Sequence, residues 1–449
     1  MIVNIKVSNF LSFNEETELS LSAGKIRRNA DRIYTNRNVR ILKCLSIFGP
    51  NASGKSNLMR VIFFIKKSLI ENKIPREYTN KYYKLDKKNI HKPSKFEISI
   101  LINKIIYVYG FTVILSKGQF VDEWLYEKNN NKLLFKLNSY ESIFEVGTYF
   151  KNKKTIRRLE IYGNDCMGTN SLFLRNINDK KDKMYEDFGE LDILRDIFNW
   201  FVFSLKIHFP SNRLDIYPDF IESNIEQISK ILNALDTGVT KLSYIQETVN
   251  QIKNKIPNEL ISDIYDDLML QEDDKHTKSI LVRSDKQFYT FELNEDNEMV
   301  VTSLQFTHNI KDIYFDMDEE SDGTTHLLDL VEILLDTKRE RTFVFDEIER
   351  CLHPAITVKF LELFLELAKE RNNQLIITTH ESRILAEDIL RNDEIIFIKK
   401  DKMGASNIIT LDSKKLRSDK KVYQAFFDLK NGLDVLPEID NKALYNITK

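Results

Sequence analysis

Cysteine is scarce in this sequence, and its three residues, Cys44, Cys166 and Cys351, are far apart. Such sparse thiols exclude a disulfide framework and a cysteine-ligated zinc cluster. Glycine is also scarce, with 13 residues in a chain of 449, so the close pair Gly49 and Gly54 is the more informative.

Long apolar runs are lacking as well, because no stretch approaches the roughly 18 apolar residues that a membrane-spanning helix needs. The first residues do not have the basic-then-apolar order of a signal peptide. Neither sign of charge is in excess, since 66 basic and 68 acidic side chains leave a formal net charge of −2. The whole-chain charge therefore gives no sign of nucleic-acid binding, and we expect a cytoplasmic protein without membrane contact.

Apolar residues make up 42% of the chain and charged residues 30%, which is typical of an ordered globular protein with two or three lobes. Residues 1–185 carry mostly strand patterns, and residues 96–175 are typical of an antiparallel sheet. Strands are also expected at 2–7, 17–21 and 41–48, and a helix is expected from Lys55 onward.

Residues 186–275 have helical periodicity and form the second expected segment, an inserted helical lobe. Its apolar stripe consists of Ile221, Ile225, Ile228, Ile231 and Leu232. The third segment, 276–449, begins with a hairpin-like stretch at 279–306 and then alternates between helix and strand. That alternation predicts a parallel sheet covered by helices, with elements at 327–335, 342–345, 358–368 and 375–378.

One stretch matches the phosphate-binding pattern G-x-x-x-x-G-K-[ST] in full, and it lies between an expected strand and an expected helix. Glycines let the backbone curl so that N–H groups and the helix N-terminus face phosphates. In this pattern the lysine reaches the β- and γ-phosphates, and the following hydroxyl ligates Mg²⁺. The expected nucleotide-binding residues are Gly49, Asn51, Ala52, Ser53, Gly54, Lys55, Ser56 and Asn57.

A second candidate site follows the apolar strand 342–345, which ends in Asp346 and Glu347. At the carboxyl end of a parallel strand, Asp346 can approach the Mg²⁺ held by Ser56. Glu347 is then placed to act as the general base for water. Two acids that merely close a strand would be the default interpretation of this segment taken alone.

Two further positions are candidates because of their place in the chain. Ser321 precedes the helix before the acidic strand, where it is a natural N-cap, and an N-terminus with a nearby glycine also offers N–H groups to a γ-phosphate. The candidate contacts are Ser321, Gly323 and Thr324. His380 ends the next buried strand and is expected to contact the γ-phosphate and orient water, although a lone histidine there is more often structural.

The order of these motifs resembles the ABC-type ATPases. Within them, 9–13 (NFLSF) and 347–354 (EIERCLHP) are similar to the RecF, SMC and OLD branch. The closest likeness is to the stand-alone ATPases of bacterial abortive-infection and anti-phage systems, such as PARIS- and RloA-type ATPase subunits. This likeness also includes 320–324, Tyr109–Phe111 and Glu123–Leu125, and it is weakest over 186–275.

The resemblance implies an α/β fold, the head of an ABC-type P-loop ATPase. Such a head has a mixed sheet covered by helices and an antiparallel β subdomain, here with an inserted helical lobe. It also implies ATP and Mg²⁺ as cofactors, and a head-to-head dimer in which the signature residues contact nucleotide on the opposite protomer. His353 and Pro354 would close the D-loop. This chain departs from the branch at Leu11, where Lys or Arg is frequent, and in its Ser-Asp-Gly-Thr signature.

Two functions remain open from the sequence. The first is the sensor or scaffold ATPase of an anti-phage system that controls a separate effector, such as a TOPRIM-type nuclease or a toxin, because only residues 381–449 follow His380. The second is a RecF- or SMC-like repair ATPase that binds duplex DNA. Its candidate DNA contacts are Lys81, Lys84, Lys87 and Lys88, and Lys151, Lys153, Lys154, Arg157 and Arg158. Both functions use the same catalytic residues, Lys55, Glu347 and His380.

Overall fold

The computed structural model describes residues 1–37, 39–179, 185–186, 188–210, 218–252, 255–256, 258–270, 279–284, 287–294, 296, 298–310, 313–336, 340–411 and 422–427. These residues form two compact units. Unit 1 comprises 1–212, 338–349 and 361–449, and unit 2 comprises 213–337 and 350–360. The segment 186–275 therefore lies partly in each unit.

The central sheet of unit 1 is the parallel sheet that the alternation of helices and strands predicted, so the α/β fold is confirmed. Five of its six strands run parallel, and β19 is antiparallel at one edge. In spatial order the strands are β11 (Leu205–His208), β16 (Thr342–Phe345), β17 (Gln374–Thr378), β5 (Cys44–Phe48), β18 (Ile395–Lys400) and β19 (Ser406–Thr410).

Strands β5, β16 and β17 are neighbours in this sheet, and all three are completely buried. Their registers pair Phe345 with Ile377 and Thr378 with Ile47. Because the carboxyl ends of parallel strands meet at one edge, the loops that follow Phe48, Phe345 and Thr378 lie together there.

A seven-stranded antiparallel sheet forms the other large sheet of unit 1, as the pattern over 96–175 led us to expect. Its order is β10 (Ile143–Val146), β9 (Lys132–Asn138), β8 (Gln119–Glu127), β7 (Ile105–Ile114), β6 (Ser94–Ile102), β1 (Ile2–Ser8) and β2 (Thr17–Ser20). A separate hairpin pairs β3 (Ile33–Asn36) with β4 (Val39–Leu42).

The expectation of sheet throughout 96–175 was wrong after Val146, where two helices follow, α2 (Lys153–Cys166) and α3 (Phe173–Ile177). The side chain of Asn152 caps α2 by accepting a 2.9 Å hydrogen bond from the Lys154 N–H. The buried positions of α2 recur at helical spacing, at Thr155, Leu159, Gly163 and Cys166. This spacing was masked by the charged and β-branched residues between them.

The single strand expected at 41–48 is interrupted at Lys43, which separates β4 from β5. The Lys43 side chain is buried, and its Nζ donates a 2.6 Å hydrogen bond to the carbonyl of Ala368. Two strands with different partners thus meet at Lys43. In a hydrophobicity pattern this lysine is only one polar residue within a continuous apolar run, so the pattern predicted a single strand.

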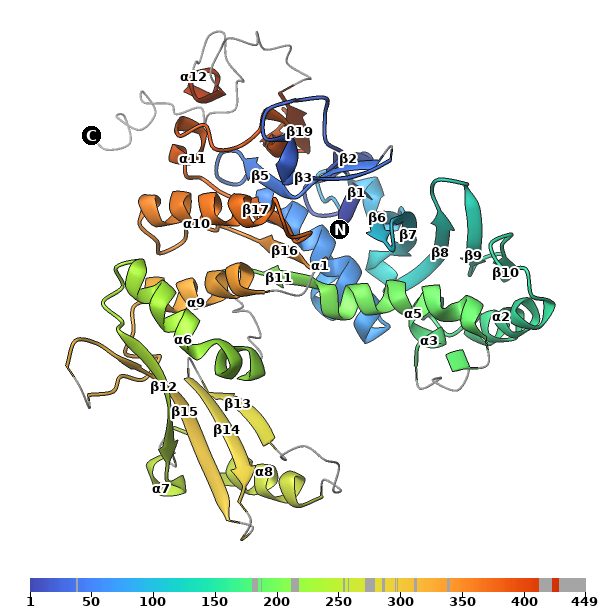
Figure 1. Ribbon diagram of the computed structural model, residues 1–449. Coiled ribbons are helices and arrows are strands. Elements are labelled where there is room, and N and C mark those ends of the chain that lie inside the picture. Colours follow the sequence, from blue (N-terminus) through green and yellow to red (C-terminus); the bar gives the residue numbers. More distant parts are fainter. Residues whose placement is uncertain are drawn as a thin grey trace, which may run out of the picture. The chain divides into compact units, whose positions relative to one another are not determined.

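The other helices of unit 1 begin with α1, which follows β5 directly in the chain (Figure 1). Their bounds are α1 (Lys55–Glu71), α5 (Asp192–Asn199), a π-helical turn (Trp200–Ser204), α11 (Arg383–Ala386) and α12 (Val422–Phe427). Short 3₁₀ turns occupy Ala30–Arg32, Arg76–Tyr78, Lys87–His91, Leu115–Lys117, Gly189–Leu191 and Asn392–Glu394. The division between the units falls within α10 (Pro354–Leu367).

Unit 2 contains an antiparallel sheet of four strands together with helices (Figure 1). The strand order is β12 (Lys241–Glu247), β15 (Met299–Thr307), β14 (Gln287–Leu293) and β13 (Ser279–Ser284). Its helices are α6 (Pro218–Ala234), α7 (Val249–Ile252), α8 (Asn258–Leu270) and α9 (Asp322–Leu335). Helix α6 packs beside both α9 and β12.

The interpretation of 186–275 as a helical lobe was wrong in part, because β11 and β12 lie within it beside helices α5 to α8. Strand β12 pairs with β15 along its whole length, with Leu242 opposite Phe306. It thereby joins the hairpin region predicted at 279–306, which is confirmed as strands β13 to β15. The tertiary partner decided between strand and helix here.

Within the part of the chain that the structure describes, no helix is both long and apolar enough to cross a lipid bilayer.

Candidate functional site

The loop between β5 and α1 holds the eight-residue phosphate-binding pattern, and its glycines are required by close approaches. A Cβ atom at Gly49 would lie 2.3 Å from the carbonyl oxygen of Ile398. A Cβ atom at Gly54 would lie 2.2 Å from the Oγ of Ser406, and Gly54 has a φ of 114°, a conformation that favours glycine. Asn51 and Ala52 are exposed in the same loop. The loop can therefore curl only with glycine at these two positions.

Lys55 is the first residue of α1, and its side chain turns back onto the loop. Its Nζ donates to the carbonyls of Gly49, at 2.8 Å, and Pro50, at 3.1 Å. Burial lowers the pKa of Lys55 to about 8, against the opposing effect of the negative charges on Asp346, Glu349 and Glu347. The ammonium group thus lies near three carboxylates from the far end of the sequence.

The two predicted metal ligands lie together although 290 positions separate them. The Ser56 hydroxyl donates to Oδ1 of Asp346 at 3.0 Å, and the Thr378 hydroxyl donates to the same oxygen at 2.6 Å. The Asp346 N–H donates to the His208 carbonyl at 3.0 Å, which fixes the end of β16. A hydroxyl and a carboxylate oxygen at this separation are hard oxygen ligands of the kind that Mg²⁺ prefers, so the donor set fits the ion.

Glu347 follows Asp346 with a φ of 55°, in the left-handed region that non-glycine residues seldom adopt. Its N–H donates to the Thr378 hydroxyl at 2.8 Å, and the next N–H, from Ile348, donates to the Thr378 carbonyl at 3.2 Å. Strained backbone of this kind is concentrated at functional sites. Thr378, which sequence reasoning did not single out, therefore organises both acids.

His380 lies just beyond β17, and its N–H donates to Oε1 of Glu349 at 2.6 Å. Desolvation of the imidazole, followed by the positive charge of Lys55, lowers the pKa of His380 against the opposing carboxylates. The residue is exposed, and the lowered pKa favours the neutral form of the imidazole. Glu349 is a second residue that the sequence analysis missed, although its spacing of two from Glu347 was a usable signal.

A group of hydroxyls and an amide also supports the loop. The Ser406 hydroxyl, at the start of β19, donates to the carbonyl of Ser53 at 2.6 Å. The Asn57 amide donates to the Ser12 hydroxyl at 2.8 Å, and the Ser406 N–H donates to the Ser12 carbonyl at 2.7 Å. No pattern in the sequence singles out Ser406, because it joins the loop only through the folded sheet.

Leu11 stands where the resemblance to RecF, SMC and OLD proteins led us to expect Lys or Arg. It has a left-handed φ of 52°. Its N–H donates to the carbonyl of Lys81 at 2.6 Å. In this chain Leu11 therefore shapes a turn and packs against the core of unit 1.

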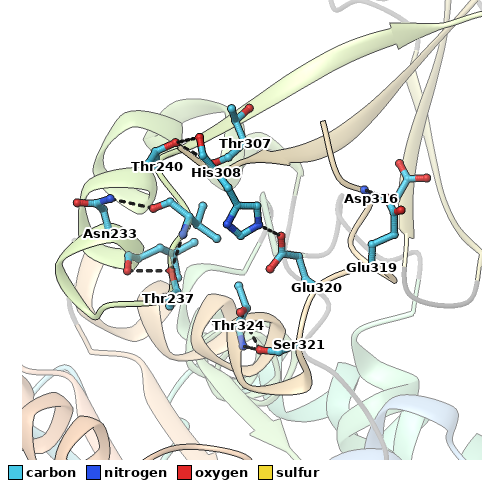
Figure 2. A network of polar contacts seen from close by, with 12 residues as sticks. Asn233, Thr237, Thr240, Thr307, His308, Asp316, Glu319, Glu320, Ser321 and Thr324 are labelled. Carbon is cyan, nitrogen blue, oxygen red and sulfur yellow. Dashed lines mark hydrogen bonds and ion pairs between the residues drawn. The ribbon is translucent and has the colours of Figure 1, made fainter. Parts of the chain in front are cut away.

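The predicted signature residues belong to unit 2, at the N-terminus of α9. Ser321 is the N-cap, since its hydroxyl accepts a hydrogen bond from the Thr324 N–H at 3.0 Å (Figure 2). Ser321 is exposed, whereas Thr324 is buried. Gly323 has a packing role of its own, because a Cβ atom there would lie 2.7 Å from the carbonyl of Cys351. The capping interpretation of Ser321 is thus confirmed, and Ser321 and Asp322 are the exposed residues at this end of the helix.

His353 and Pro354, the residues expected to form a D-loop, also belong to unit 2. Nδ1 of His353 accepts a 3.2 Å hydrogen bond from the Ala355 N–H, and α10 begins at Pro354.

Both basic segments that were candidates for DNA contact belong to unit 1. On α2, the side chains of Lys153, Lys154, Arg157 and Arg158 are all exposed.

Comparisons with known proteins show the family of this chain. The family described as "AAA domain, putative AbiEii toxin, Type IV TA system" matches residues 44–163 and 192–386. A curated relative, probable ABC transporter ATP-binding protein p29 of Mesomycoplasma hyorhinis, is 30% identical over 115 residues. That match covers 24% of this chain and 45% of p29, so the chain spans less than half of the relative's length.

Two solved structures are similar at low identity. One is the SmcHead bound to the C-winged helix domain of ScpA, at 14% identity and a TM-score of 0.41, with 91% of this chain and 97% of that chain covered. The other is the SMC head domain from Thermotoga maritima, at 12% identity and a TM-score of 0.33, with 91% and 98% covered.

Proposed function

The chain belongs to the AAA-domain family that matches most of its length, and from that premise we propose that it binds ATP with Mg²⁺ and hydrolyses the nucleotide. The observation that carries this proposal is the 3.0 Å contact between the Ser56 hydroxyl and Oδ1 of Asp346, beside the Lys55 ammonium. A hydroxyl, a carboxylate and an ammonium gathered at a glycine loop form the constellation that a metal-bound triphosphate requires.

In this proposal Lys55 exchanges its two loop carbonyls for oxygens of the β- and γ-phosphates. Ser56 and Asp346 would hold Mg²⁺, and the bound ion would neutralise charge on the phosphates. The N-terminus of α1 contributes positive potential to the same place. Gly49, Asn51, Ala52, Ser53, Gly54 and Asn57 are the loop residues assigned to nucleotide binding.

Glu347 is the proposed general base. It accepts a proton from water while the water oxygen forms a bond to the γ-phosphorus and the bond from that phosphorus to the β–γ bridging oxygen breaks, which releases ADP and phosphate. His380, whose N–H donates to Glu349, is assigned to the γ-phosphate and to the orientation of the water. Ser321, Gly323 and Thr324 are assigned to the nucleotide of a second protomer.

We infer for the cell a sensor or scaffold ATPase of an anti-phage, abortive-infection system that acts in the cytoplasm. The printed family description, which names an AbiEii toxin and a type IV TA system, supports this role. The partners would be a second copy of the chain and a separate effector. This role is proposed from the resemblance to PARIS- and RloA-type ATPases. Duplex DNA is a second candidate partner, because the basic side chains of α2 are exposed.

Two substitutions test the chemistry. Lys55→Ala should abolish ATP binding, because it removes the cation at the phosphates. Glu347→Gln should retain binding but lower turnover by roughly a hundredfold or more, because it removes the base. Equilibrium binding and phosphate release measure the two steps. Lys84→Ala and Glu141→Gln, at exposed positions of unit 1, are the matched controls and should behave as wild type.

Normal turnover by Glu347→Gln would remove the assignment of the base. Unchanged ATP binding by Lys55→Ala would contradict the nucleotide site itself. For the inferred role, the purified wild-type chain should show no nuclease activity by itself. A nuclease activity in this chain alone would contradict a separate effector.

A further inference from the structure

The segment Phe315–Glu320 leads directly into the signature helix α9, and the sheet of unit 2 holds it at successive points. Phe315 forms two backbone hydrogen bonds with Phe306 of β15, at 2.8 and 2.9 Å. The N–H of Met317 donates to the side-chain oxygen of Gln287 at 2.9 Å, and Gln287 is the first residue of β14. The chain that precedes the signature is therefore attached to two strands of the sheet.

Asp316 adds a third attachment. Its Oδ1 accepts a 3.0 Å hydrogen bond from the Gln305 side chain of β15, and its other carboxylate oxygen pairs with Lys255 from the connection between α7 and α8. The Asp316 N–H donates to the carboxylate of Glu319 at 2.8 Å, which closes a turn before the helix. Helices α7 and α8, whose residues pack in the core of this sheet, are thus tied to the same short segment.

The attachment nearest to the signature is a histidine–glutamate pair. Nε2 of His308 lies 2.7 Å from Oε1 of Glu320, and Figure 2 shows the ring pointing at the carboxylate. The Glu320 side chain is only 5% exposed. Glu320 directly precedes Ser321, the N-cap of α9, so the position of its side chain fixes the position of Ser321.

His308 has neighbours at both its ring and its backbone. The Phe315 ring meets the His308 ring edge-on, with centroids 5.0 Å apart. The hydroxyl of Thr240, the residue before β12, donates to the His308 carbonyl at 2.6 Å (Figure 2). A Cβ atom added at Gly238 would lie 3.4 Å from Nδ1 of the ring. The His308 ring therefore has a defined position at the end of the sheet, and the Glu320 side chain extends toward it.

We propose that His308 and Glu320 form a positioning pair that couples the four-stranded sheet of unit 2 to Ser321 and thereby supports ATP hydrolysis. The inference rests on the proposed function, because it requires Ser321 to act on the nucleotide of a second protomer. Neither residue touches the nucleotide in this scheme. Both act through the N-cap, where a small shift removes an N–H group from its phosphate.

The test uses His308→Ala, Glu320→Ala and the double variant, each in the full chain. Dimer formation with ATP is measured in the Glu347→Gln background by analytical ultracentrifugation, and hydrolysis is measured with Glu347 intact. Each single variant should weaken ATP-dependent dimerisation by about fivefold or more. The double variant should lose no more than either single variant, because both break one contact. The kcat should fall while the KM for ATP is unchanged.

Two further variants separate positioning from folding. Glu320→Gln retains an oxygen that accepts from the imidazole, so it should recover most of the dimerisation. Glu298→Ala removes an exposed carboxylate at the other end of the same sheet, in the turn between β14 and β15, and should match the parent. These controls leave the core of unit 2 intact.

The outcomes distinguish the inference from the function beneath it. If Ser321→Arg leaves dimerisation and hydrolysis unchanged, the proposed function fails at the signature. If Ser321→Arg abolishes both while His308→Ala and Glu320→Ala match Glu298→Ala, only the positioning pair is overturned. Equal losses of ATP affinity and thermal stability in the two alanine variants would make the contact merely structural, and would overturn the pair as well.

Discussion

Lys55 shows how the fold prepares a charge for a ligand. The side chain is almost completely buried, and two loop carbonyls accept from its ammonium group. Those carbonyls are weaker partners than phosphate oxygens, because hydrogen bonds between ionised groups are the stronger ones. The loop carbonyls and the nearby carboxylates of Asp346, Glu349 and Glu347 therefore offset only part of the free-energy cost of burying the cation. In the proposed function, a bound triphosphate would give the ammonium group stronger acceptors and would offset the rest of this cost.

Nucleotide affinity should depend on pH through this lysine. Burial lowers the pKa of Lys55 to about 8 without nucleotide, and phosphates will raise it on binding. Above pH 8, binding must therefore take up a proton, and the affinity for ATP should fall by up to about tenfold per pH unit. Below pH 8 this group causes no change. Titrations with a fluorescent ATP analogue at pH 7, 8 and 9 measure the slope.

The matched control is Lys55→Arg, because arginine remains charged throughout this range. Its affinity for ATP is expected to be lower overall, but with a flatter pH dependence than the wild type. Parallel slopes for the two proteins would show that Lys55 does not titrate in this window.

At the scale of elements, β8 and α3 are joined by a buried acid. Glu123 of β8 accepts from the N–H groups of Phe173 and Leu174 at the start of α3, and from the hydroxyl of Tyr109 on β7. Burial nonetheless raises the pKa of Glu123 to about 7, because these three donors offset only part of the desolvation. The pairing of α3 with the antiparallel sheet is therefore sensitive to pH.

Glu123→Gln should change how stability depends on pH. A carboxyl with a raised folded pKa stabilises the fold at acidic pH, and this contribution is lost as pH rises from about 4.5 toward 7. The melting temperature of the wild type minus that of Glu123→Gln should therefore decrease between pH 5 and pH 8. The limit is about 3 kcal/mol of unfolding free energy. Thermal melts of both proteins measure it, and Glu394, present in both, cancels from the difference. Identical pH profiles of the two proteins would contradict the raised pKa of Glu123.

The sequence predicted helices and strands well where the pattern of neighbouring residues was enough. It did so less well where contacts with distant parts of the chain determine the structure. Strand β16 has the expected bounds and helix α1 the expected starting point, because a short apolar run and an amphipathic helical pattern are local signals. Strand β12 was missed because its stability comes from β15, far along the chain. Lys43 was missed as a strand break because only the folded chain supplies Ala368 as its partner.

The candidate site follows the same division. A motif pattern identified Lys55, Ser56 and Asp346, and the structure brings all three together. Thr378 and Ser406 carry no motif, yet the first holds both acids and the second fixes the loop. Hydroxyls of this kind are common in any sequence, so only the strand register that places them beside the site distinguishes them.

At the scale of the whole molecule, the proposed catalytic residues and the proposed signature residues belong to different units. Lys55 and Glu347 are in unit 1, and Ser321 is in unit 2. In a symmetric dimer, each nucleotide would be enclosed by unit 1 of one protomer and the signature of the other. Hydrolysis would then require two chains, and each chain would contribute to two sites.

Mixing two inactive variants should therefore restore activity. Lys55→Ala lacks the phosphate cation, and Ser321→Arg places a bulky cation at the signature. In a mixed dimer both defects fall in one site, and the other site is intact. At equal concentrations, about half of the dimers are mixed and each carries one working site, so phosphate release should reach about a quarter of the wild-type rate. The control pairs Lys55→Ala with a chain that carries both substitutions, and because every site then lacks Lys55 it should remain inactive. If the first mixture also stays inactive while each variant still folds, the signature does not act across the dimer, and Ser321 is only the cap of its own helix.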